Sequence, residues 1–270
     1  MNNNLPTPPI VMTIAGSDSG AGAGIQADLK TFAAHNVYGT SVLTAVTAQN
    51  TTGVIAVQEL SVIMIAHQIK AVMEDMPIQA VKTGMLSSAK IITQVVSSLK
   101  QYGIQQLVVD PVMVAKGGDK LLQDEAIQTL KEKLLPHALV LTPNIPEAEV
   151  LTGLPIETLD DARHAAKTLI SMGPKTVVVK GGHRKGEPID IFYDGSSYYE
   201  FTSDRITTTS DHGTGCTFSA AITANLAKTL SIKDAVEQAK IYVSASLRSA
   251  YPVGKGHGPL NHFGHLDPSR

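Results

Sequence analysis

Short apolar segments typical of buried strands alternate with longer segments of helical spacing along almost the whole chain. The expected strands are rich in β-branched residues and cover residues 10–15, 41–48, 80–83, 107–110, 138–142 and 176–180. Helical spacing is clearest after the first of them, with apolar residues at i, i+4, i+7 and i+8: Ile25, Leu29, Phe32 and Ala33. Because fully apolar strands need cover on both faces, this alternation predicts an α/β fold with a mostly parallel central sheet.

Further helices and one hairpin complete the expected pattern. Helical stretches are expected over residues 63–72, 91–102, 121–135, 147–151, 162–172, 217–229 and 232–250. The β-prone runs 189–193 and 198–201 flank Asp-Gly-Ser-Ser and predict a hairpin. A chain of 270 residues allows one large domain or two smaller ones. No linker interrupts the pattern, so we expect a single domain over residues 1–270, with a flexible N-terminus at 1–9.

Composition excludes several classes of protein. The 22 basic and 24 acidic residues give a net charge of −2 without a long like-charge run, which argues against nucleic-acid binding. Cys216 is the single cysteine, so no intrachain disulfide can form, and this fits a reducing compartment. The N-terminus lacks the features of a signal peptide, and no apolar run is long enough to cross a bilayer. We therefore expect a cytoplasmic protein that binds neither nucleic acid nor membrane.

Unusual residues gather where the expected strands end. They are Asp18, Lys82, Asp110, Thr142, Asn144, Lys180 and His183, together with their neighbouring glycines and prolines. Loops collect Gly, Pro and Asn in any protein, but that tendency does not explain Lys82 and Asp110 at the last positions of apolar strands. Because ligands of parallel sheets bind at the carboxyl ends of the strands, we expect a ligand site at this edge.

The segment His-Gly-Thr-Gly-Cys-Thr at residues 212–217 stands directly before an expected helix. Backbone N–H groups at a helix start are unpaired, and with the helix dipole they can bind a transferring phosphoryl group. Cys216 falls in the first turn, where we expect a lowered thiol pKa and an available thiolate. A glycine-rich helix entry with an inert, buried cysteine explains this isolated motif equally well.

Three other patterns carry less information. The glycine-rich segment 15–28 matches neither the dinucleotide motif nor the P-loop, but it includes Asp28, a carboxylate in an otherwise apolar helix. Asn144 and Glu147 have the spacing of a capping box, which leaves Glu147 free to face a metal as well. Four histidines match no closed zinc pattern, so we expect them to be solvated surface residues: His183, His257, His262 and His265.

Seven motifs occur in a characteristic order: A-G-S-D-S-G-A-G-A-G-I-Q-A-D-L-K-T-F, V-T-A-Q-N-T, K-T-G-M-L, D-P-V-M, T-P-N-I-P-E-A, K-G-G-H and H-G-T-G-C-T-F-S-A-A. Together they closely resemble the hydroxymethylpyrimidine/phosphomethylpyrimidine kinases of thiamine biosynthesis, which are ribokinase-like. The resemblance covers residues 10–263. It implies a single α/β domain, two successive phosphoryl transfers from ATP with Mg²⁺, and a homodimer. A monovalent cation is a further candidate ligand.

The resemblance also implies roles for individual residues. For the substrate they are Gln49 and Asp28, which would hold the pyrimidine, with Ala15, Gly16, Met85 and Val112 around it. For phosphoryl transfer they are Cys216 as base and the backbone of Gly213 and Gly215. For ATP they are Lys180, Asn144, Thr142, Thr214 and Lys240, and for the metal Glu147 and Asp110. The chemistry of the first pair fits, because an amide donates and accepts at once and a carboxylate accepts from an amino group.

Two departures and two alternatives accompany the resemblance. Ala21 replaces a glycine of the family's loop, which changes the loop if that position needs positive φ, and Asp211 adds a negative charge beside the phosphate site. A pyridoxal/pyridoxine kinase is the nearest alternative, alone or as a second activity, although Gln49 favours the pyrimidine. A non-catalytic binder of thiamine precursors or pyridoxal phosphate would need neither metal-orienting carboxylates nor a base such as Cys216.

Overall fold

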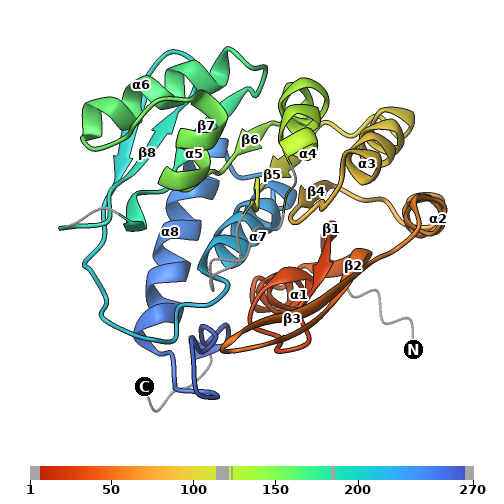
Figure 1. Cartoon of the computed structure of the whole chain (residues 1–270), viewed down its shortest axis with the longest axis horizontal. Helices are drawn as coiled ribbons and strands as arrows, with labels where there is room; N and C mark the ends of the chain where they lie inside the picture. Colours follow the sequence, from red (N-terminus) through yellow and green to blue (C-terminus); the bar gives the residue numbers. More distant parts are fainter. Residues whose placement is uncertain (1–6, 114–121, 123, 184–185, 265–270) are drawn as a thin grey trace.

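The computed structural model describes residues 7–113, 122, 124–183 and 186–264, which form one sheet covered by helices on both faces (Figure 1). Within these residues the nine strands stand in the order β3-β2-β1-β4-β5-β6-β7-β8-β9. Their bounds are β1 Ile10–Ser17, β2 Tyr38–Asn50, β3 Gly53–Glu59, β4 Ala80–Thr83, β5 Leu107–Val109, β6 Val140–Leu141, β7 Thr176–Val179, β8 Asp190–Tyr193 and β9 Tyr198–Phe201. All pairings from β2 to β7 are parallel, whereas β3, β8 and β9 pair antiparallel. The predicted mostly parallel α/β sheet is confirmed.

Helices form two layers around this sheet. Their bounds are α1 Gly24–Ala34, α2 Val62–Met73, α3 Ala89–Gln101, α4 Asp124–Thr129, α5 Ile145–Thr152, α6 Leu159–Ile170, α7 Thr214–Ala227 and α8 Ile232–Arg248. Successive strand residues point to opposite faces. Leu107 and Val109 of β5 therefore belong to the core under α2–α6, while Val108 belongs to the core under α7 and α8.

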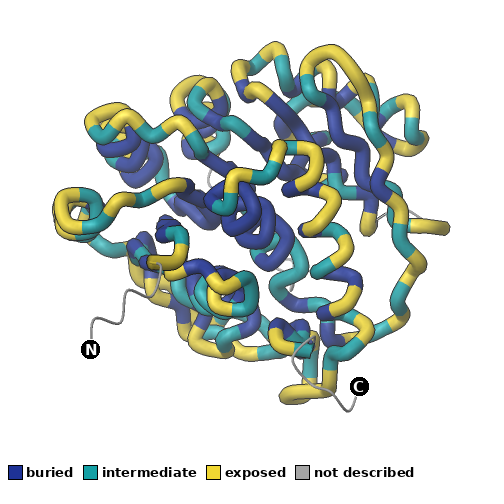
Figure 2. Tube along the Cα trace, turned by 180° about the vertical axis from the view of Figure 1, so that it is seen from behind, coloured by how far each residue is buried: buried dark blue, intermediate teal, exposed yellow. Residues whose placement is uncertain are grey.

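Helix α7 runs through the interior of the molecule. Every residue from Thr217 to Ala227 is buried, and the helix is the dark blue one at the centre of Figure 2. Small residues such as Ala220 and Ala224 allow this, because they let α7 pack closely against its neighbours. The first turn of α7 is therefore anchored by the core at the carboxyl edge of the sheet.

Most expected elements are found within a few residues of their expected bounds. The strand expected at 80–83 is β4, and the expected hairpin is β8 and β9. Of the helix expected at 121–135, residues 121 and 123 lie outside the described residues. The rest is α4, followed by a π turn at Leu130–Leu134 and a 3-10 turn at Leu135–His137. Strand β3 was not expected, because most of its residues are exposed and it lacks an alternating apolar pattern.

Candidate active site

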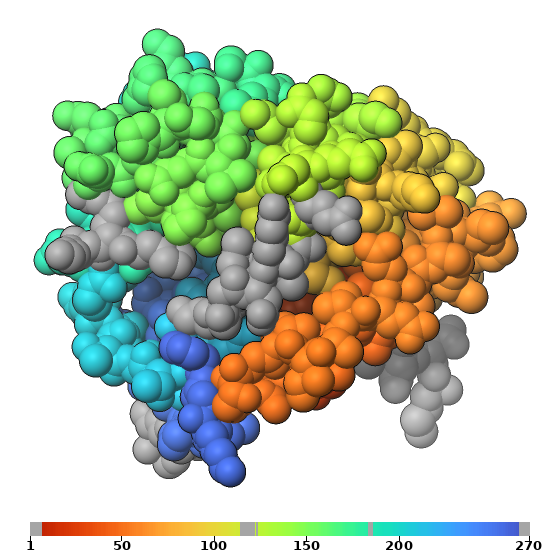
Figure 3. Space-filling model, viewed as in Figure 1, coloured from red at the N-terminus to blue at the C-terminus, as the bar shows by residue number. Residues whose placement is uncertain are grey.

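A cavity of about 560 Å³ lies at the carboxyl edge of the parallel strands. Figure 3 shows the face of the molecule on which the orange residues of β3 and the green residues of α5 lie. The cavity is lined by residues from six strand ends and from the start of α7, among them Ala15, Gly16, Asp18, Thr47, Gln49, Met85, Asp110, Val112, Asn144, Glu147, Lys180 and Asp211–Cys216. The prediction that the strand ends meet in one place is therefore confirmed for these residues.

The backbone at the start of α7 forms one wall of the cavity. Gly213 has φ of +84°, and a Cβ on it would lie only 1.9 Å from the carbonyl oxygen of Gly22. Glycine is therefore required where the two loops touch. The hydroxyl of Thr214 donates to the carbonyl oxygen of Asp211 at 2.6 Å. The following N–H groups have no acceptor within the helix and line the cavity, as an anion site requires.

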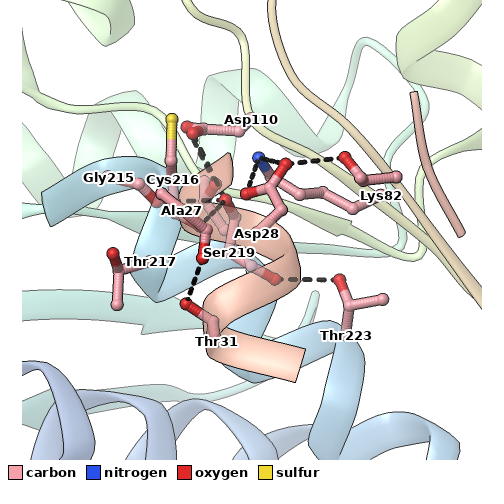
Figure 4. Close-up of polar contacts among 12 residues, drawn as sticks. Ala27, Asp28, Thr31, Lys82, Asp110, Gly215, Cys216, Thr217, Ser219 and Thr223 are labelled. Carbon is pink, nitrogen blue, oxygen red and sulfur yellow. Dashed lines mark hydrogen bonds and ion pairs between the residues drawn. The ribbon is translucent and has the colours of Figure 1, made fainter. Parts of the chain in front are cut away.

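Cys216 is half-buried and lines the cavity, and its Sγ accepts a hydrogen bond from the N–H of Gly24. In Figure 4 its sulfur points away from the polar contacts of Asp28. Burial raises the pKa of the Cys216 thiol to about 11; the positive charge of Lys82 opposes this, and Asp28 and Asp110 reinforce it. The expectation of a lowered pKa is wrong, because desolvation outweighs the helix start. Cys216 is a thiol at neutral pH.

A charged cluster faces the same space next to the first turn of α7, because a Cβ on Gly215 would lie 3.1 Å from Lys180 Nζ and 3.7 Å from Asp110 Oδ2. Lys180 Nζ lies 3.0 Å from Asp110 Oδ1, and Ser219 of α7 donates to Asp110 Oδ2 at 3.3 Å. Burial raises the pKa of Glu147 to about 7; Lys180 lowers it and Asp110 raises it further. Burial acts to lower the pKa of Lys180, but the carboxylates of Asp110 and Glu147 outweigh it and raise this pKa. Two carboxylates held close together fit the oxygen ligands that Mg²⁺ prefers.

Asn144 and Glu147 form the capping box of α5. Asn144 Oδ1 accepts from the N–H of Glu147 at 2.9 Å, and Glu147 Oε2 accepts from the N–H of Asn144 at 2.8 Å. The predicted cap is confirmed. Both residues also line the cavity, so capping leaves Glu147 facing the same space as Asp110.

Three of the expected site residues lie outside this cavity. Asp28 is fully buried and accepts from Lys82 Nζ at 2.7 and 2.8 Å, behind the cavity wall (Figure 4). Thr142 is fully buried and donates to Asp110 Oδ1 at 3.3 Å. The expected direct contacts of Asp28 with the ring and of Thr142 with phosphate are therefore corrected. Neither side chain reaches the cavity, because each is turned into the protein and held by a partner there.

Lys240 lies beside a second cavity. Its Nζ lies 2.9 Å from Asp190 Oδ2 and 3.1 Å from the carbonyl oxygen of Pro188. This cavity, of about 230 Å³, shares Lys180, Asp211 and Thr214 with the first one. The two cavities therefore meet at the start of α7.

The structure adds one side chain to the site that sequence reasoning left without a role. His212 lies between Asp18 and Gln49, with its Nε2 2.9 Å from Asp18 Oδ2 and 3.3 Å from the Gln49 amide. Its place directly before the Gly-Thr-Gly-Cys motif was the available signal. Ala21 adopts φ of +60°, so this loop keeps the left-handed conformation without glycine.

The histidines considered for zinc have other surroundings. His262 is 2% exposed and bonds Thr217, so the expectation of a solvated surface residue is wrong for it. His257 Nδ1 lies 2.8 Å from Asp211 Oδ1, and His265 lies outside the described residues. The described part of the chain holds no group of three or more His, Cys, Asp or Glu side chains placed to bind a metal. Among the described residues, none of the helices has the length and apolar character that crossing a bilayer requires.

Comparisons with known proteins agree with this geometry. A family model described as phosphomethylpyrimidine kinase matches residues 18–261. A hydroxymethylpyrimidine/phosphomethylpyrimidine kinase of Bacillus subtilis is 51% identical over 93% of this chain and 94% of its own. A solved phosphomethylpyrimidine kinase of Clostridium difficile is 48% identical over 87% of this chain and 97% of its own, with a TM-score of 0.79. An ADP complex of Bacillus subtilis pyridoxal kinase is 39% identical over 95% of this chain and 98% of its own, with a TM-score of 0.89.

Proposed function

We propose a role for each part of the cavity on the premise that this chain belongs to the phosphomethylpyrimidine kinase family. The enzyme transfers a phosphoryl group from ATP to 4-amino-5-hydroxymethyl-2-methylpyrimidine and then a second one to the monophosphate, in thiamine biosynthesis. The observation that carries this function is the 51% identity to the Bacillus subtilis kinase over 93% of the chain. The cavity supports it, because an anion-binding helix start and paired carboxylates border one space.

The heterocycle occupies the end of the cavity bordered by β1 and β2. Gln49 offers an amide that donates and accepts at once, as an aminopyrimidine edge requires. Met85 and Val112 supply apolar walls, and the backbone of Ala15 and Gly16 closes the bottom. Asp28 acts only from behind this wall, through its contact with Lys82.

The transferring phosphoryl group lies at the start of α7. Backbone N–H groups of Gly213, Gly215 and Cys216 stabilise its charge, and Lys180, whose Nζ lies next to Gly215, adds a positive charge. The attacking oxygen is the substrate's hydroxymethyl group, and Cys216 accepts its proton when the thiol is ionised. In the second transfer the acceptor is already a phosphate anion, which needs little help from a base.

The metal and the nucleotide lie beside this centre. Asp110 and Glu147 are the residues that would hold Mg²⁺, and the ion would supply positive charge for the ATP phosphates. ATP extends from the start of α7 into the second cavity, where Thr214 and Lys240 contact it and Asn144 borders its phosphates. The ADP complex of the structurally similar pyridoxal kinase supports the use of ATP.

The surface and the composition support a proposal for the assembly and the location of the enzyme. Exposed apolar residues occur on β2, β3 and α2, namely Val46, Ile55, Val57, Ile63 and Met64. Such a group on a water-soluble enzyme marks an interaction surface, and a second copy of the chain covers it in a homodimer. We further propose a cytoplasmic location, which the single cysteine and the use of ATP support.

Pyridoxal phosphorylation is the second candidate activity. It is supported by the similarity to a pyridoxal kinase, which is 39% identical over 95% of this chain with a TM-score of 0.89. The deciding experiment compares kcat/KM for phosphate transfer from Mg-ATP to the hydroxymethylpyrimidine and to pyridoxal, for the wild type and Gln49→Met. We expect the wild type to prefer the pyrimidine and the substitution to abolish that preference. A preference for pyridoxal that Gln49→Met leaves unchanged would assign the enzyme to vitamin B6 instead.

A further inference from the structure

His212 joins two segments of the cavity wall that are far apart in the sequence. Its Nε2 lies 2.9 Å from Asp18 Oδ2, at the end of β1, and its backbone N–H donates to the carbonyl oxygen of Gly258 at 2.9 Å. The imidazole ring packs against Gly22, where an added Cβ would lie 2.4 Å from His212 Cδ2. The position of Nε2 is therefore fixed by packing as well as by its partner.

The charge state of Asp18 determines which of the two side chains donates the hydrogen bond between them. The carboxylate accepts from the N–H groups of Gly20, Gly22 and Ala23 at 2.8, 3.0 and 2.8 Å. Burial acts to raise the pKa of Asp18, but the contact with His212 and the N–H groups of Ala23 and Gly20 together lower it. An ionised carboxylate has no hydrogen to give, so the hydrogen between the two side chains belongs to His212 Nε2.

The Gln49 amide then has one orientation in which every donor has an acceptor. One of its terminal atoms lies 3.3 Å from His212 Nε2, and the other lies 3.2 Å from Thr47 Oγ1. Thr47 already gives its only hydroxyl hydrogen to the carbonyl oxygen of Ser17, at 2.8 Å. An amide nitrogen facing His212 would set two donors against each other. An amide oxygen there accepts from Nε2, and the amide nitrogen then donates to Thr47 Oγ1.

We propose that His212 and Asp18 are specificity-determining positioning residues, which turn the Gln49 amide with its oxygen toward His212 and its nitrogen toward Thr47. The amide then offers an acceptor beside a donor in a fixed order. A heterocycle with an exocyclic amino group next to a ring nitrogen matches this order only with the amino group on the His212 side. The proposal rests on the proposed function and adds which way the pyrimidine ring lies.

The experiment is a double-mutant cycle on phosphate transfer from Mg-ATP to 4-amino-5-hydroxymethyl-2-methylpyrimidine. The enzymes are the wild type, His212→Leu, Gln49→Met and the double variant, with pyridoxal as the parallel acceptor. We expect His212→Leu to raise KM for the pyrimidine about 5- to 10-fold, as the loss of one hydrogen bond would, with a smaller change in kcat. The KM for pyridoxal stays unchanged. In the Gln49→Met background, His212→Leu has no further effect on KM for the pyrimidine.

Two further variants separate positioning from folding. His212→Gln keeps a donor near the place of Nε2, so it restores most of the pyrimidine KM. His257→Leu removes the other His–Asp pair beside the cavity, which does not contact Gln49, so KM stays at the wild-type value. Thermal unfolding of each variant identifies any that is not folded. If His212→Leu is not folded, the comparison of KM for the pyrimidine between His212→Gln and the wild type tests the proposal.

Three outcomes overturn the proposal. If His212→Leu raises KM for the pyrimidine equally in the wild type and in the Gln49→Met background, His212 does not act through Gln49. The same conclusion follows if His212→Leu raises KM equally for the pyrimidine and for pyridoxal. In both cases the pyrimidine kinase activity of the wild type stands. A wild type that transfers no phosphate to the pyrimidine overturns the proposed function and this proposal with it.

Discussion

At the scale of single residues, Cys216 has a thiol pKa that differs in direction from the one that its place in the sequence predicts. A thiol at a helix start is normally acidified, yet here the pKa is raised to about 11, chiefly by burial. At neutral pH only about one site in ten thousand carries the thiolate. If this minority form accepts the substrate proton, the first phosphoryl transfer depends on pH far above neutrality.

Substitution of Cys216 tests this dependence. We expect Cys216→Ala to slow the first transfer more than the second, because only the first acceptor has a proton to lose. In the wild type, kcat for the first transfer should rise about tenfold per pH unit between pH 7 and 9, following the thiolate. Single-turnover rates for each acceptor over this pH range measure both effects. Equal damage to the two steps, or a flat profile in the wild type, would remove the base role from Cys216.

Glu147 provides a second residue-scale prediction. Its pKa of about 7 in the folded protein lies above the ordinary value of 4.5, so the folded state holds a proton that the unfolded state loses. The contribution to the free energy of unfolding is therefore present below about pH 4.5 and is lost as pH rises to about 7. The difference between 4.5 and about 7 corresponds to roughly 3 kcal/mol.

Glu147→Gln should remove this pH dependence while keeping the cap, because a glutamine oxygen also accepts from the N–H of Asn144. Urea unfolding at pH 5 and pH 8 measures it. We expect the wild type to lose roughly 2–3 kcal/mol more than the variant between these two pH values. Parallel pH profiles for the two proteins would mean that Glu147 ionises normally in the fold.

At the scale of elements, the ion pair between Asp28 of α1 and Lys82 of β4 connects a helix to the middle of the sheet. Both side chains are fully buried. Removing one partner leaves the other charge buried and unpaired, which costs about 3–5 kcal/mol.

We expect Lys82→Met to lower the free energy of unfolding by this amount, and Lys82→Met with Asp28→Leu to recover most of it. Urea unfolding of the three proteins measures the difference. A single variant that loses less than about 1 kcal/mol would show that the buried pair is not paired in solution.

The sequence predicts elements better than it predicts the direction of side chains. Strand β4 has the bounds expected from its apolar run, and the residues after the strands meet at one edge because parallel strands require it. The position of Asp28 depends on which face α1 turns toward the sheet. Its spacing from Ile25 and Phe32 puts it on the apolar face of α1. A buried carboxylate needs a partner of opposite charge, and Lys82 on a buried strand supplies it. The contact of His212 with Gln49 joins positions 163 residues apart, and no local pattern indicates it.

At the scale of the whole molecule, the exposed apolar residues on β2, β3 and α2 predict self-association. We expect the wild type to sediment as a dimer in analytical ultracentrifugation. Ile55→Lys with Ile63→Lys should give the mass of one chain, because two charges would be buried without partners. Val253→Lys, at an exposed apolar residue outside this group, serves as the matched control and should remain dimeric. A wild type that sediments as one chain would contradict the prediction.

The order of strands in the sheet has a consequence for synthesis on the ribosome. From β4 to β9 each new strand joins the free edge left by the strand before it, so the sheet can grow as the chain emerges. The start of α7 and the loop with His212 come after the last strand and close against the loop that follows the first. A nascent chain that stops after β9 has all nine strands of the described residues but lacks the start of α7, which lines the cavity. Catalytic competence is therefore the last property that the growing chain acquires.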